Sequence, residues 1–121
     1  MSIERRLMPR RCPLAPVARG RNRVAGERAL AARLASLYPG DDFVDWTCLD
    51  GYNWGTSQPW SSWQSFGDLF GPGIAQLRAL STRPVHVAET GSTEVGGDKA
   101  AWITDMFAYL DQHPEVRGVT W

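Results

Sequence analysis

The sequence predicts an α/β fold in which parallel strands alternate with helices, and three observations support this fold class. Residues 84–90, "PVHVAET", are a short apolar run with β-branched residues, which is typical of a buried strand. Residues 98–113, "DKAAWITDMFAYLDQH", place apolar residues at helical spacing. From residue 42 onward, strand-like and helix-like stretches alternate, and this order favours parallel strands joined by right-handed crossovers.

The other elements complete a β-α-β-α-β order. Residues 42–54, "DFVDWTCLDGYNW", predict the first strand because they are rich in Val, Phe, Trp and Thr. Residues 71–81 predict a helix with Pro72 near its first turn, where a proline is tolerated. Residues 116–121, "VRGVTW", predict the last strand.

The helix predicted over residues 98–113 has clear signals at both ends. Asp98 is a suitable N-cap, and Pro114 ends the helix. Its apolar side chains, Trp102 and Phe107 among them, are expected in the core.

The formal net charge of zero hides two pieces of different composition. Residues 1–37 contain nine arginines against Glu4 and Glu27, a balance of +7. Residues 38–121 contain four basic residues against eleven acidic ones, a balance of −7. The change in composition predicts a boundary near residue 38, with the folded domain after it.

Residues 1–37 are expected to be a disordered or weakly helical extension. They contain no aromatic residue and three prolines, and they lack the 7–15-residue apolar stretch of a secretion signal. Only residues 26–37, "GERALAARLASL", have leucines at helical spacing. Arginine clusters attract phosphate, but the aromatic residues of a base-stacking surface are missing, so no nucleic-acid partner is expected. No stretch of the chain has the length and apolarity of a membrane helix.

The predicted order of elements raises a packing problem. Right-handed crossovers between neighbouring strands place both helices on one face of the sheet, whereas an all-parallel sheet is normally covered on both faces. A barrel turns the uncovered face inward, but a TIM barrel needs about 250 residues. Residues 38–121 are therefore expected to be part of a (β/α)₈ TIM barrel, and the chain to be incomplete.

Polar and aromatic residues gather where the predicted strands end. Tyr52 and Trp54 end the first strand, Glu89 ends the second and Trp121 ends the third. In a barrel these carboxyl ends form the active face. A carboxylate beside aromatic rings suits a sugar, because sugar rings present apolar C–H faces and glycosidic cleavage uses carboxylates.

Residues 38–121 resemble the C-terminal part of the catalytic domain of glycoside hydrolase family 26. The resemblance is carried by "YPGDDFVDWTCLDGYNWGTS", "WQSFGDLFGPGIAQLRAL", "VHVAETGSTEVGGDKAAWI" and "VRGVTW". The family contains β-mannanases and related endo-β-glycanases, and the resemblance implies barrel strands six, seven and eight. Residues 1–37 do not resemble the family. The chain therefore departs from the family's pattern where strand five should lie.

The resemblance also implies roles for the residues at the strand ends. Glu89 corresponds to the catalytic nucleophile of a retaining mechanism, and Tyr52 to the tyrosine that orients it. Trp121 corresponds to a sugar platform beside the cleaved bond, and Trp54 is expected to line the cleft. The expected substrate is a β-linked polysaccharide such as β-mannan, and no cofactor or metal is implied.

A retaining mechanism also needs a second carboxyl group about 5–5.5 Å from the nucleophile. In the family this acid/base follows strand four, and no residue of this chain has the matching context. We therefore expect the chain alone to be inactive. Two alternatives stay open: a fragment without independent function, and a non-catalytic carbohydrate-binding protein.

Other residues allow a structural as well as a functional interpretation. Asp41 and its acidic neighbours favour a solvated or capping role over a metal site, because calcium prefers more widely spaced oxygen ligands. Asp50 favours a structural hydrogen bond over catalysis. Trp60 and Trp63, in the loop after the first strand, either reach distal sugars or pack that loop.

Overall fold

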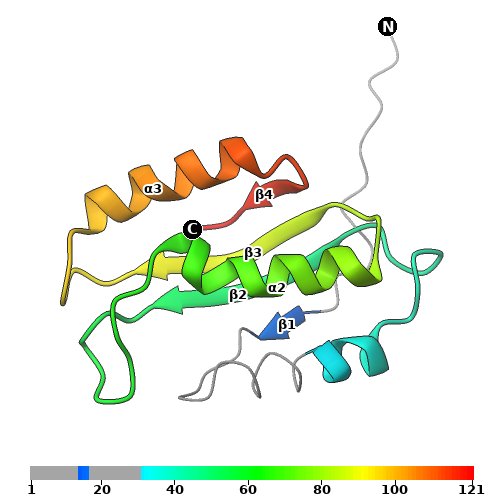
Figure 1. Ribbon diagram of the computed structural model, residues 1–121, viewed down its shortest axis with the longest axis horizontal. Helices are drawn as coiled ribbons and strands as arrows, with labels where there is room; N and C mark the ends of the chain where they lie inside the picture. The colour runs from blue at the N-terminus through cyan, green and yellow to red at the C-terminus, as the bar shows by residue number, and fades with distance from the viewer. Residues whose placement is uncertain (1–13, 17–30) are drawn as a thin grey trace, which may run out of the picture.

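The computed structural model describes residues 14–16 and 31–121, and within them it forms one parallel sheet. The strands are β1 (Leu14–Pro16), β2 (Thr47–Asn53), β3 (Val85–Ser92) and β4 (Val116–Val119), in the order β1-β2-β3-β4. Each neighbouring pair is parallel, so the predicted α/β class and strand direction are confirmed (Figure 1).

Helices α2 (Phe66–Leu80) and α3 (Lys99–Gln112) pack on a common face of the sheet (Figure 1). Their buried side chains share one core with the strands, formed by Leu49, Phe66, Leu69, Phe70, Ile74, Leu77, Val85, Val87, Trp102, Met106 and Val116. This arrangement confirms that both crossovers return to the same side. In the described part of the chain, no helix is long and apolar enough to cross a membrane.

The opposite face of the sheet has a different character. Asp50 and His86 are half-buried on it, and Tyr52 and Glu89 are exposed. We call this surface the open face. A parallel sheet with helices on one side and polar groups on the other is compatible with part of a barrel, whose inner surface the open face would form.

Strand β1 was not predicted from the sequence. Leu14 pairs with Cys48 and Pro16 with Asp50, so β1 lies beside β2, on the side where a preceding barrel strand would lie. Three residues are too few to show a strand periodicity, and prolines disfavour strand interiors. The disorder expected for the rest of 1–30 lies outside the described residues, whereas residues 31–37 are helical, as their spacing indicates.

Helix α2 begins at Phe66, earlier than the predicted residue 71. The Ser65 side chain accepts a hydrogen bond from the backbone N–H of Asp68 at 3.1 Å and caps the helix. Pro72 consequently lies inside the helix rather than in its first turn. The loop before α2 is shorter as a result. Strand β2 also starts later than predicted, at Thr47, because residues 41–43 form a turn closed by the bond from Phe43 N–H to Gly40 C=O at 3.1 Å.

Helix α3 has the predicted cap and part of the predicted core. The Asp98 carboxylate accepts a hydrogen bond from the Ala101 N–H at 3.0 Å, and Trp102 is buried. The prediction that Phe107 belongs to the core is wrong, because its side chain is 60% exposed. Met106, one turn after Trp102, takes the buried position, and Phe107 lies about 100° further round the helix.

The loops that follow β2 and β3 pack closely against each other. The Thr56 N–H donates to the Val95 carbonyl at 3.1 Å. The Trp63 ring lies against Gly97, where an added Cβ would stand only 2.4–2.6 Å from three ring atoms. Of the two interpretations of Trp63, the structure therefore supports packing of the loop. The close contact with the Trp63 ring requires glycine at position 97.

We expect Gly97→Ala to lower the free energy of unfolding by about 1–3 kcal/mol, because the methyl group overlaps the Trp63 ring. Chemical denaturation followed by circular dichroism measures the change. Gly91→Ala is a matched control, since its Cβ would lie at an ordinary 3.5 Å from the Tyr52 ring. Equal stability of the Gly97 variant and the parent would contradict the close packing.

Candidate active site

Tyr52 and Glu89 meet on the open face, near the carboxyl ends of β2 and β3. The Tyr52 hydroxyl donates a hydrogen bond to Oε2 of Glu89, with 2.7 Å between the oxygens. The tyrosine ring lies over Gly91, its register partner, where an added Cβ would be in ordinary contact with the ring at 3.5 Å. Two residues that are 37 positions apart in sequence therefore form one hydrogen-bonded pair.

A bulge in β3 determines the direction of Glu89. Leu49 pairs with Val87, but the next residue, Asp50, pairs with Glu89, so Ala88 is the extra residue. Val87 is buried against the helices, and strict alternation would turn Glu89 to the same side. The extra residue reverses the alternation and turns Glu89 to the open face.

The charge of Glu89 acts on its partner. The pKa of Tyr52 is raised above its ordinary value, chiefly because its hydroxyl donates to the Glu89 carboxylate. Partial burial and the nearby negative charges of Glu89 and Asp50 raise this pKa further. The phenol therefore keeps its proton near neutral pH and remains a donor that holds the carboxylate in place.

Asp50 lies beside the pair, as the direct register partner of Glu89. Its Oδ1 atom is buried and has no hydrogen-bond partner among the described residues. The structural hydrogen bond expected for Asp50 is not present at this oxygen. A buried acceptor without a partner is costly, and no described residue offsets that cost for Oδ1.

Trp54 extends the site along the β2–α2 loop. Its ring centroid lies 5.7 Å from that of Tyr52 and 6.2 Å from that of Trp60. Tyr52, Trp54 and Trp60 are all exposed. The structure thus brings three of the four expected site residues together, namely Tyr52, Trp54 and Glu89, and adds Trp60.

Trp121 occupies a different place from the other three. Its ring lies 6.0 Å from that of Trp102, and the Lys99 ammonium stands 5.6 Å from the ring centroid. A second register shift, between Val85 and His86, brings Thr120 to the open face, where it contacts His86 at 3.2 Å. The next residue, Trp121, therefore turns toward the helix side. Its role as a sugar platform stays a prediction.

The sequence placed Asn53 at the end of the first predicted strand but assigned it no role. Its side chain is only 1% exposed, whereas its sequence neighbours Tyr52 and Trp54 are exposed. Its Nδ2 group donates to the Ser92 hydroxyl at 2.9 Å. Its Oδ1 atom accepts from the N–H groups of Gly55 and Gln64 at 3.2 and 3.1 Å. An asparagine at a predicted strand end was the available signal, because a buried amide needs partners on both sides.

Asp41 serves the opposite end of the sheet. Its carboxylate accepts hydrogen bonds from the side chains of Tyr38, Ser81 and Thr82, and these bonds hold its pKa well below the ordinary range, with Ser81 contributing most. Asp41 thereby ties the segment before β2 to the segment before β3. Across residues 14–16 and 31–121, no three His, Cys, Asp or Glu side chains cluster in a way that could hold a metal ion.

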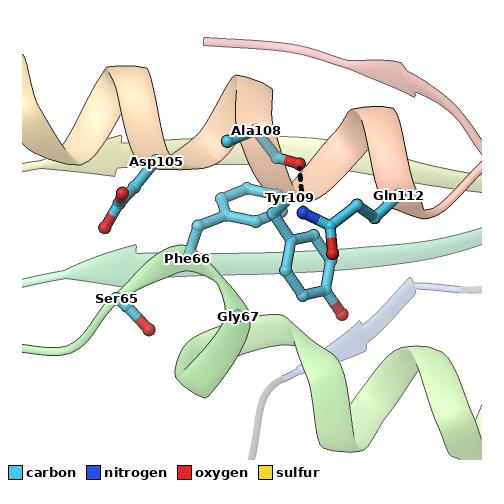
Figure 2. Close-up of a pocket in the computed structure, with 7 residues that line it drawn as sticks. All are labelled: Ser65, Phe66, Gly67, Asp105, Ala108, Tyr109 and Gln112. Atoms are coloured by element: carbon cyan, nitrogen blue, oxygen red, sulfur yellow. Dashed lines mark hydrogen bonds between the residues drawn. The ribbon is translucent and has the colours of Figure 1, made fainter.

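A hollow of about 250 Å³ lies between the start of α2 and α3. Figure 2 shows the rings of Phe66 and Tyr109 next to each other among its lining residues, with Ser65 and Asp105 to one side of them. Its lining comes from the helix side of the sheet, away from Tyr52 and Glu89, and its Ser65 hydroxyl already caps α2. The hollow is therefore a packing feature and not part of the candidate site.

Comparison with known proteins finds a relative of part of the chain. The chain is 49% identical over 71 residues to Endoglucanase H of Acetivibrio thermocellus. The matched residues are 58% of this chain and 8% of the endoglucanase, so the chain spans a small part of that protein. No family model matches the chain. Over this stretch the chain is related to a glycoside hydrolase.

We expect Glu89→Gln to lower the pKa of Tyr52 toward its ordinary value of 10.0, because the variant removes the charge that the phenol contacts. NMR titration of tyrosine ¹³Cζ resonances measures the shift. Tyr109 is the internal control, since its raised pKa has another cause, burial and then Glu115. An unchanged Tyr52 titration would show that the pair does not form in solution.

We expect Asn53→Ala to lower the free energy of unfolding by about 2–4 kcal/mol, because two backbone N–H groups lose their acceptor. Ser92→Ala leaves both N–H bonds intact and should cost about 1 kcal/mol. Urea denaturation of the two variants and the parent measures the difference. Equal costs would mean that the amide oxygen contributes nothing to the loop.

Proposed function

We propose that this chain belongs to the catalytic unit of a retaining glycoside hydrolase that cleaves β-linked polysaccharides. The observation that carries the proposal is the 2.7 Å hydrogen bond between the Tyr52 hydroxyl and Glu89, near the carboxyl ends of two parallel strands. The relationship to an endoglucanase supports the same reaction class. The resemblance to family 26 supports a (β/α)₈ barrel in which β2, β3 and β4 are strands six, seven and eight.

In the proposed reaction, Glu89 is the nucleophile and Tyr52 is its positioning residue. Tyr52 holds Oε2, which leaves Oε1 to attack the anomeric carbon of the sugar. The new bond from Oε1 to this carbon forms as the bond to the glycosidic oxygen breaks. Water then attacks the same carbon, releases the sugar with retained configuration and restores the carboxylate.

The second carboxyl group of the mechanism protonates the leaving oxygen and later takes a proton from water. We propose that this group comes from a barrel strand that residues 38–121 do not include. On that basis the chain alone binds the glycan without cleaving it. Carbohydrate binding is also the second candidate function, and the exposed aromatic rings of Tyr52 and Trp54 favour it.

The experiment that tests catalysis supplies the missing strands. Residues 38–121 replace the matching segment of Endoglucanase H from Acetivibrio thermocellus, and the chimeric protein is assayed on β-glucan and β-mannan. We expect Glu89→Ala to reduce kcat by at least about four orders of magnitude, since the nucleophile is lost. Added azide should restore part of the activity by occupying the place of the carboxylate.

Two further variants make the result specific to the pair. Tyr52→Phe keeps the ring and removes the hydrogen bond, so kcat should fall about a hundredfold. Glu94→Ala, at an exposed loop glutamate five residues after Glu89, should leave kcat unchanged. Activity retained by Glu89→Ala would overturn the assignment of the nucleophile.

A further inference from the structure

The aromatic rings beside Glu89 continue beyond the residues assigned to the reaction. Trp60, in the β2–α2 loop, is 55% exposed, and its ring stands 6.2 Å from that of Trp54 in an edge-to-face contact. Trp54 in turn lies 5.7 Å from Tyr52, which contacts the nucleophile. Tyr52, Trp54 and Trp60 thus form a continuous aromatic row that starts at the candidate reaction centre.

The loop that carries this row is held by internal hydrogen bonds. The Ser57 hydroxyl donates to the Trp54 carbonyl at 2.5 Å, and the Ser61 hydroxyl donates to the Gly55 carbonyl at 2.6 Å. Trp60 lies between these two braced positions. Its exposed ring is therefore presented by an ordered loop, and a ligand would not have to order that loop on binding.

The two indoles of the β2–α2 loop, Trp60 and Trp63, differ in exposure. The same loop contains Trp63, which lies against Gly97 and packs on the core. One of the two indoles thus closes the loop onto the domain, while the other presents more than half of its surface to solvent. A large exposed aromatic side chain on an ordered loop is typical of a binding surface.

The geometry points to a sugar-binding platform. We propose that Trp60, together with Trp54, stacks against sugar units of a β-linked glycan that runs from Glu89 along the β2–α2 loop. The ring centroids lie 5.7 and 6.2 Å apart, and the ring planes are inclined at 48° and 67° to each other. An indole presents a broad apolar face to the C–H groups of a sugar and loses little conformational entropy on binding. This inference rests on the proposed function and adds a subsite distant from the cleaved bond.

A platform away from the reaction centre makes affinity depend on the length of the glycan. A disaccharide at the Tyr52 end does not reach Trp60, whereas a hexasaccharide does. The full 121-residue chain should therefore bind cellohexaose at least about tenfold more tightly than cellobiose. Isothermal titration calorimetry with both sugars measures the difference.

Trp60→Ala should weaken binding of cellohexaose about five- to tenfold and leave binding of cellobiose unchanged, since one stacking contact is lost. The affinity of Trp60→Phe for cellohexaose should lie between that of the parent and that of Trp60→Ala. Phe107→Ala is the matched control, because Phe107 is similarly exposed but lies on α3. Circular dichroism confirms that each variant keeps the parent's fold.

Two results would overturn the platform. One is equal affinity of the parent and Trp60→Ala for cellohexaose, and the other is the absence of binding by either protein. Neither result decides the proposed reaction, which depends on Glu89→Ala in the chimeric enzyme. In that enzyme Trp60→Ala should raise KM for the hexasaccharide about five- to tenfold without lowering kcat, whereas a merely structural role would lower kcat as well.

Discussion

The arrangement of the candidate site depends on one buried amide, the side chain of Asn53. Asn53 is the last residue of β2, and its amide connects this strand to β3 through Ser92 and to the β2–α2 loop through Gly55 and Gln64. The Gln64 carbonyl then accepts a hydrogen bond from the Trp102 indole at 2.7 Å, which extends the connection to α3. Because Asn53 lies between Tyr52 and Trp54 in the sequence, fixing this amide also restricts the backbone that carries these two rings.

The carboxylates at the two ends of the sheet differ in their hydrogen bonding and exposure. At the amino ends of β2 and β3, the Asp41 carboxylate accepts hydrogen bonds from Ser81 and Thr82. These bonds hold the segment before β2 against the segment before β3. Near the carboxyl ends, Glu89 is exposed and receives one positioning bond from Tyr52. A parallel sheet brings all its carboxyl ends to one edge, so Tyr52 and Glu89 lie together near that edge.

The two tryptophans Trp60 and Trp63 of the β2–α2 loop have different environments. Trp63 packs against Gly97 of the neighbouring loop, and Trp60 is exposed beside Trp54. Burying one indole anchors the loop, and an anchored loop can present the other without a large entropic cost on binding. Under the proposed function, this difference makes the loop set the length of glycan that the site contacts.

The sequence by itself determined the alternation of strands and helices, the parallel direction of β2 to β4, and the carboxylate and aromatic residues at the strand ends. These features are local: they depend on periodicity, caps such as Asp98 and the residue types themselves. Only the tertiary structure decided β1, the exposure of Phe107, the buried oxygen of Asp50 and the direction of Trp121. It also decided that Glu89 faces Tyr52. Ala88 is an extra residue only relative to the pairing of β3 with β2, and this pairing turns Glu89 toward Tyr52. Strand alternation is a property of one segment, whereas a bulge is a relation between two, and one segment of sequence does not contain that relation.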